Sequence, residues 1–147
     1  MVTAKDVAAH ILLRAGAMSA MKLQKLVYYA QAWSLALRGA PLFRERIQAW
    51  AQGPVVYELF ELHRGRYVVA SLPPPVRDLT EEQRALVDQV VSHYGTMTAE
   101  ALSKLTHSEM PWRAARTGVP EGQRASAVVT SEAMRQFYAM QPVPFAA

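Results

Sequence analysis

The chain has 147 residues, of which 51% are hydrophobic, and it contains no cysteine. This length and composition favour one globular domain with a packed core, and the lack of cysteine excludes disulfides, thiolate metal sites and cysteine nucleophiles. No apolar run approaches the roughly 20 residues that span a bilayer, and no basic-then-apolar leader opens the chain, so we expect a cytoplasmic protein with no membrane partner.

The first half of the chain carries the signals of three helices. Apolar spacing and helix-stop glycines predict helices over 3–16, 19–39 and 53–65. The hydroxyls of Thr3 and Ser19 can cap the first two. The third follows a Gly-Pro turn, because proline is favoured at the first position of a helix.

Two short segments have the character of strands. Residues 67–70 are rich in valine and tyrosine, which favour extended backbone, and residues 47–50 follow an irregular or extended stretch. We expect these two segments to pair as a small hairpin.

The second half of the chain is also predicted to be helical. A capping box opens a helix over 80–95, and a short helix follows over 99–105. Residues 106–109 form a second capping-box pattern that is expected to start another short helix. Residues 117–129 are rich in Gly, Pro and small side chains and are predicted to form a loop, and a last helix covers about 130–141.

The predicted fold class is therefore mainly α: a single compact helical domain of six or seven helices with at most one small β-hairpin. We assign this domain to residues 1–141 and a short C-terminal tail to residues 142–147. The tail ends in Ala146-Ala147, which resembles bacterial degradation signals. The alternative is a frayed terminus without a function of its own.

The formal charge of +4 is modest, and most of the basic residues are arginines scattered between Arg14 and Arg135. A nucleic-acid-binding protein would concentrate these arginines on one element. A solvated basic surface that favours an acidic partner is the simpler interpretation. A nucleic-acid-binding protein that contacts phosphates through these arginines is an alternative, although we do not expect nucleic acid as a partner.

The residues give no convergent catalytic set. His10, His63, His93 and His107 lie on different predicted elements, and none is spaced with a second ligand as in a metal motif. Sequence neighbours such as His107 and Glu109 diverge at a helix cap, whereas catalytic groups must converge on one reacting atom. We therefore expect no catalytic residues, no cofactor and no bound metal.

One polar stripe is harder to explain. Gln24, Tyr28 and Gln31 follow one another at helical spacing beside the apolar face of the second helix. These side chains need hydrogen-bond partners inside the fold or on another molecule. We favour internal partners that pin the Gly53-Pro54 turn or the helix predicted after Thr106, and exposed glutamines would instead be the first candidates for partner contact.

Two tryptophans lie where the chain changes direction. Trp50 precedes the Gly-Pro turn, and Trp112 follows Pro111. Each tryptophan can lock a turn by packing while its N–H meets a freed carbonyl. Each can equally anchor a partner, because tryptophan is enriched in interface hot spots.

Three blocks of sequence together resemble one protein family. They are Lys22–Trp33, Pro41–Val55 and Leu102–Arg113, which include the motifs Lys-Leu-Gln-Lys-Leu-Val-Tyr-Tyr-Ala-Gln-Ala-Trp, Pro-Leu-Phe, Gly-Pro-Val and Pro-Trp-Arg. In order and spacing they resemble the Panacea antitoxin domain family, a group of SocA-like and phage-associated GepA-like bacterial proteins. The resemblance covers roughly residues 5–140.

The resemblance implies an antitoxin that neutralises a cognate toxin by direct protein contact, with the toxin encoded by the adjacent gene. One family member is described as an adaptor that delivers its toxin to a Clp-type protease, so such a protease is a second candidate partner. A nucleic-acid-binding, phage-associated protein is the further alternative. The family has no established catalytic residues. The positions that match its blocks are candidate partner-binding residues: Gln24, Tyr28, Gln31, Trp50, Gly53, Pro54, His107, Pro111 and Trp112.

Overall fold

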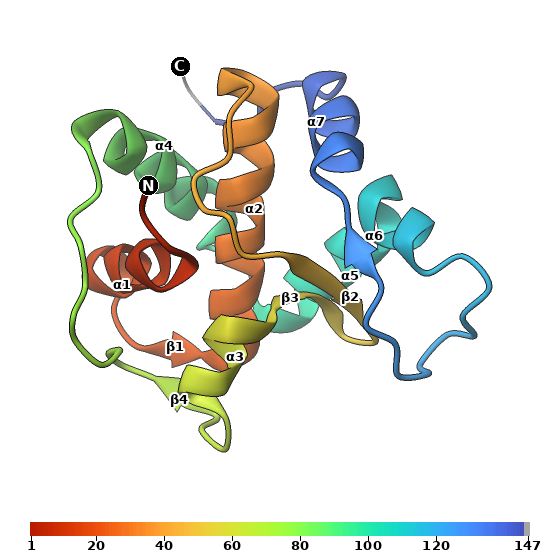
Figure 1. Cartoon of the computed structure of the whole chain (residues 1–147), viewed down its shortest axis with the longest axis horizontal. Helices are drawn as coiled ribbons and strands as arrows, with labels where there is room; N and C mark the ends of the chain where they lie inside the picture. The colour runs from red at the N-terminus through yellow and green to blue at the C-terminus, as the bar shows by residue number, and fades with distance from the viewer. Residues whose placement is uncertain (146–147) are drawn as a thin grey trace.

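A computed structural model of the chain describes residues 1–145, which form seven helices and five short strands (Figure 1). The helices are α1 (Ala4–Ala15), α2 (Ala20–Arg38), α3 (Tyr57–His63), α4 (Glu81–Tyr94), α5 (Ala99–Ser108), α6 (Met110–Ala115) and α7 (Ser131–Ala139). The strands are β1 (Met18–Ser19), β2 (Ile47–Trp50), β3 (Gly53–Val56), β4 (Val68–Val69) and β5 (Val128–Val129). In this part of the chain no helix is both long and apolar enough to cross a membrane.

Helix α2 is the centre of the molecule. It runs through the middle of the fold, with α1 and α4 packed on one side and α7 on the other (Figure 1). The Ser19 hydroxyl caps its first turn, and Gly39 ends it in the left-handed conformation. Residues 23–35 are all buried, so this helix is covered on every side over that stretch, as expected of a core helix.

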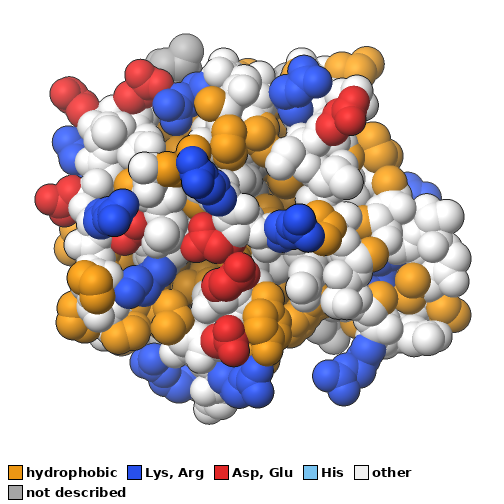
Figure 2. Space-filling view, viewed as in Figure 1, with side chains coloured by type: hydrophobic (Ala, Val, Ile, Leu, Met, Phe, Trp, Pro, Cys, Tyr) orange, Lys and Arg blue, Asp and Glu red, His pale blue; other side chains and the backbone are white. Residues whose placement is uncertain are grey.

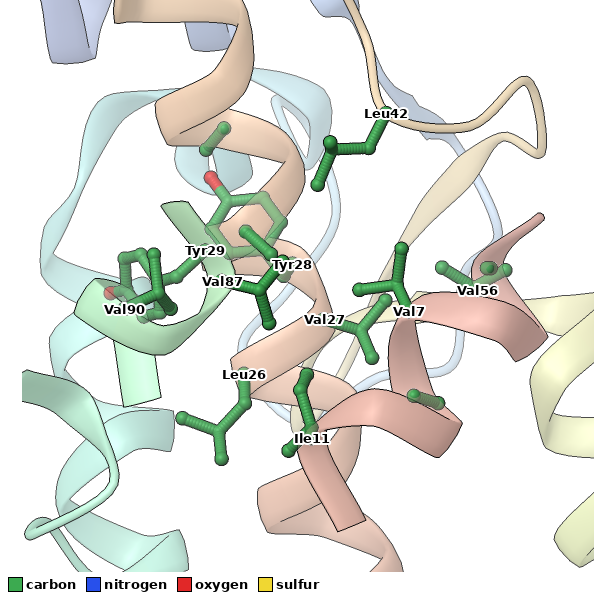
Figure 3. Packing of buried hydrophobic residues seen from close by; sticks show 14 of the residues in the cluster. Val7, Ile11, Leu26, Val27, Tyr28, Tyr29, Leu42, Val56, Val87 and Val90 are labelled. Atoms are coloured by element: carbon green, nitrogen blue, oxygen red, sulfur yellow. The ribbon is translucent and has the colours of Figure 1, made fainter. Parts of the chain in front are cut away.

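The main core lies where α1 and α4 meet α2. Ile11 of α1, Leu26 of α2 and Val90 of α4 are fully buried there, together with the neighbouring valines (Figure 3). Tyr28 and Tyr29 extend this core toward α7. The packing therefore fixes α2 rigidly and makes it the element from which polar side chains can reach the sheet.

The strands form two small sheets, so the prediction of at most one small hairpin was too low. Strand β1 pairs with β4, and β2 lies between β3 and β5 in a three-stranded antiparallel sheet. The predicted pairing of residues 67–70 with 47–50 is wrong. Residues 47–50 fold back on 53–56 through a two-residue turn instead, because a local hairpin closes a much shorter loop.

Three other boundaries differ from the prediction. The third helix starts at Tyr57 and not at residue 53, because residues 53–56 belong to the sheet. Thr106 does not open a helix. It lies in the last turn of α5, where its hydroxyl donates to the Ser103 carbonyl, and α6 begins at Met110 without a side-chain cap. Residues 128–129, predicted as loop, form β5.

The C-terminal segment returns to the core. The Phe145 ring lies 5.6 Å from the Trp33 ring, edge to face. The predicted degradation signal at Ala146-Ala147 lies outside the described residues.

Candidate partner-binding site

The polar stripe of α2 is internal, and Gln24 completes the free edge of β3. Its amide oxygen accepts from the Val56 N–H at 2.9 Å, and its amide nitrogen donates to the Val56 carbonyl at 3.2 Å. The same nitrogen lies 3.0 Å from Nε2 of His63. Because the amide nitrogen can only donate, His63 accepts at Nε2 and is neutral, and its burial lowers its pKa.

Gln31 binds backbone groups in the same way, but on the segment that precedes β2. Its amide oxygen accepts from the N–H groups of Leu42 and Phe43 at 2.8 and 3.3 Å, and its nitrogen donates to the Phe43 carbonyl at 2.9 Å. The two glutamines are only 2% and 3% exposed. They therefore bind the backbone that enters and leaves the β2–β3 hairpin, close to but not at the turn that we expected them to pin.

Tyr28 belongs to a separate buried network that the sequence did not reveal. Glu109 accepts from the hydroxyls of Tyr29 and Tyr138 at 2.7 and 2.8 Å. The Tyr138 proton is therefore engaged, so Tyr28 donates to the Tyr138 oxygen at 3.0 Å. Burial raises the pKa of the Glu109 carboxyl, and no cation pairs with it within the described residues. The network ties α7 to α2 at the junction of α5 and α6.

Lys25 makes the second contact of α2 with the edge of β3. It is 1% exposed, and its amine donates to the Pro54 carbonyl at 3.4 Å. Gly53 packs against its stem in a positive-φ conformation (+127°), and a Cβ atom there would lie 2.4 Å from Cε of Lys25. Burial lowers the pKa of Lys25 from 10.5 to about 7. Among residues 1–145 the amine thus has no carboxylate partner.

The third block of the sequence supports the hairpin from the other side. The indole N–H of Trp112 donates to the Trp50 carbonyl at 2.9 Å, and the Ser103 hydroxyl donates to the Gln52 carbonyl at 2.6 Å. His107 stacks on Trp112, with ring centroids 4.0 Å apart. Pro111 is buried in the first turn of α6.

Two features of this support were missed in the sequence. Nε2 of His107 is buried without a hydrogen-bond partner among the described residues, and its burial, followed by the charges of Lys25 and Arg116, lowers the pKa of its ring. Arg116 is 5% exposed and donates to the Ala49 carbonyl at 2.9 Å and to the Gln123 carbonyl at 2.6 Å. It thereby fixes the loop that joins α6 to β5, residues 116–127, against strand β2.

Side chains of α2 cover the edge of β3, and Trp112 and Arg116 bind the carbonyls of β2, so one face of the hairpin is left open. A cleft of about 640 Å³ lies over this face, and we call it the hairpin cleft. Its walls are the hairpin, Tyr57 at the start of α3, and the 116–127 loop; the lining residues are Gln48, Trp50, Ala51, Gln52, Tyr57, Arg124, Ala125 and Ser126. Figure 2 shows the molecule hollowed between its central mass and the lobe on the right, with hydrophobic side chains along the central side.

The nine candidate residues thus divide into two groups. Trp50 lines the hairpin cleft. The other eight have structural contacts: Gly53 and Pro54 begin strand β3 of the hairpin, Tyr28 belongs to the Glu109 network, and the remaining five lie beneath or beside the hairpin, namely Gln24, Gln31, His107, Pro111 and Trp112. The wall residues Tyr57 and Arg124 were missed, because no helical or strand periodicity marks a residue that meets others only through tertiary structure. In the described part of the chain, no group of three or more His, Asp or Glu side chains is placed to hold a metal ion.

Comparison with known proteins gives two matches. The sequence profile of the family described as "Antitoxin SocA-like, Panacea domain" matches residues 23–113. The protein Antitoxin SocA of Caulobacter vibrioides is 30% identical, over 76% of this chain and 69% of its own length. No solved structure matches the chain significantly.

Proposed function

Because the chain belongs to the antitoxin SocA-like, Panacea domain family, we propose that it is an antitoxin that neutralises a cognate toxin by direct protein–protein binding. The hairpin cleft is the observation that supports a binding role. It combines exposed aromatic and arginine side chains, which are enriched in interface hot spots, with walls fixed by buried hydrogen bonds. A rigid surface of this kind loses little conformational entropy when a partner binds.

The polar groups of the matched blocks support binding rather than chemistry. The side chains of Gln24, Gln31 and Trp112 are bonded to the backbone of the hairpin and its approach. Groups held in this way position a surface, and they are not free to exchange protons with a substrate. We accordingly propose a cytoplasmic protein without enzymatic activity of its own.

Co-expression with the product of the adjacent gene tests this proposal. We expect the neighbouring protein to arrest growth when expressed alone, and we expect co-expression of this chain to relieve the arrest. The two proteins should also co-purify as a stable complex. A neighbour that is harmless and does not co-purify would contradict the antitoxin role.

We propose a Clp-type protease as a second partner, either for the delivered toxin or for turnover of the antitoxin itself. The C-terminal Ala146-Ala147, which lies outside the described residues, is the candidate signal for turnover. Replacing both alanines with aspartate should lengthen the lifetime of the protein after synthesis is blocked. An unchanged lifetime would remove the turnover signal from the proposal.

A further inference from the structure

Hydrogen bonds from α6 and from Arg116 hold the hairpin side of the cleft in place. In an isolated two-stranded ribbon the outer carbonyls of β2 would be free, but here Arg116 and Trp112 donate to the carbonyls of Ala49 and Trp50. Arg116 also binds the carbonyl of Gln123 in the opposite wall. One buried guanidinium therefore binds both the hairpin and the 116–127 loop and fixes the spacing between the two walls of the cleft.

The hairpin side of the cleft is aromatic. The ring of Trp50 lies 4.9 Å from that of Phe60 and 6.4 Å from that of Tyr57. The indole N–H of Trp50 already donates to Gln48 at 2.7 Å. The indole N–H of Trp50 therefore needs no hydrogen-bond partner from another molecule. Its apolar ring lines the cleft and suits contact with an apolar side chain.

The opposite wall is cationic. Arg124 is the only charged residue among those that line the cleft, and in the described residues it takes part in no ion pair. On the hairpin side, outside the lining residues, Arg64 lies over the Phe60 ring at 5.1 Å and donates to the Tyr57 hydroxyl at 3.2 Å. The acidic residues Glu58, Glu61 and Glu121 belong to the neighbouring elements and do not line the cleft.

We propose that the hairpin cleft receives a segment of the toxin in which an apolar side chain is flanked by a carboxylate. This inference rests on the proposed antitoxin function and assigns the site of toxin contact. The apolar side chain packs against Trp50 and Tyr57 on the hairpin side of the cleft, and the carboxylate pairs with Arg124. An arginine favours this pairing because its planar fork matches a carboxylate with two parallel hydrogen bonds, which a lysine cannot form.

Two substitutions on the loop wall test the inference without touching the supports of the hairpin. Arg124→Glu reverses the charge of the cleft, and Ser126→Trp fills it with a bulky side chain. Both positions are exposed, so the melting temperature should stay close to that of the unchanged protein. Arg135→Glu and Ala139→Trp make the same two changes at exposed positions of α7 outside the cleft and serve as matched controls.

The affinity of each purified variant for the product of the adjacent gene is measured by calorimetry, and rescue of growth is measured in parallel. We expect each cleft substitution to weaken binding by roughly tenfold or more, because each affects the centre of an interface, and each control to stay within about twofold. An acidic-to-lysine substitution in the toxin that restores binding to the Arg124→Glu protein would identify the paired carboxylate.

The outcomes separate this inference from the function on which it rests. If the unchanged protein binds and both cleft variants bind equally well, the toxin contacts another face and the inference is overturned while the antitoxin role stands. If Ser126→Trp blocks binding but Arg124→Glu does not, the carboxylate is overturned. If the unchanged protein does not bind at all, the antitoxin role fails and the inference fails with it.

Discussion

Lys25 should make the stability of this protein rise with pH in a range where most proteins change little. Its amine is buried beside Gly53 and Pro54, and burial lowers its pKa from 10.5 to about 7. Between these two values the unfolded chain binds a proton that the folded chain does not. Stability therefore increases with pH by up to about 1.4 kcal/mol per pH unit. Integration from pH 7 to pH 9 gives a gain of about 2 kcal/mol.

The buried histidines and tyrosines change the stability mainly outside this pH range. Burial lowers the pKa values of His63 and His107 below 6.5, so their contribution to the pH dependence is complete near neutrality. Arg66 near His63, and Arg116 and Glu121 near His107, are the charged neighbours of this cluster besides Lys25. The buried tyrosines have raised pKa values and reduce stability only at pH values above 10.

Urea unfolding at pH 7, 8 and 9 measures the effect. Lys25→Met should remove most of the increase between pH 7 and pH 9, because methionine fills the same space without a titrating amine. Lys104→Met, at an exposed position of α5, should keep the full increase. A wild-type stability that stays flat or falls over this range, or a Lys25→Met protein with the wild-type slope, would refute the assignment.

Substitutions at three further positions test the buried contacts of the hairpin and of the Glu109 network by urea unfolding at pH 7.5. Gln24→Leu should cost about 2–4 kcal/mol, because both backbone groups of Val56 lose their partner in a buried place. Glu109→Leu should cost a similar amount by leaving two tyrosine hydroxyls unpaired, whereas Glu109→Gln should cost less than about 1 kcal/mol, since its amide oxygen can still accept. Gly53→Ala should cost about 2–4 kcal/mol from its positive φ and its clash with Lys25; a cost near zero would show that the hairpin is not held tightly on α2.

The helices could be predicted from local signals, and the sheet could not. Thr3, Ser19 and Thr80 cap helices because a hydroxyl and the backbone within three residues suffice for a cap. Strand β3 contains Pro54, which normally argues against a strand. It is tolerated here because Pro54 faces Ala49 at the edge of the sheet, and its carbonyl turns toward Lys25. The sequence does not show that β3 is an edge strand, because this position depends on the tertiary arrangement of the sheet.

The candidate site shows the same division. The sequence identified Gln24 and Gln31 as polar groups in need of partners, which periodicity alone can show. It could not identify their partners, because Val56 and Phe43 contribute backbone atoms that carry no signal of residue type. In the same way Arg116 gave no signal, although it binds carbonyls on both sides of the hairpin cleft.

The two walls of the cleft lie differently with respect to the family match. The match ends at Arg113, so it includes the hairpin with its supports in α2, α5 and α6. The opposite wall, with Arg124 and Ser126, follows this range. A change at Arg124 or Ser126 alters the charge or width of the cleft at an exposed position, whereas a change in the hairpin or at Arg116 must preserve buried hydrogen bonds. If the toxin binds in the cleft, this loop is therefore the wall on which partner preference can change with the smallest cost in stability.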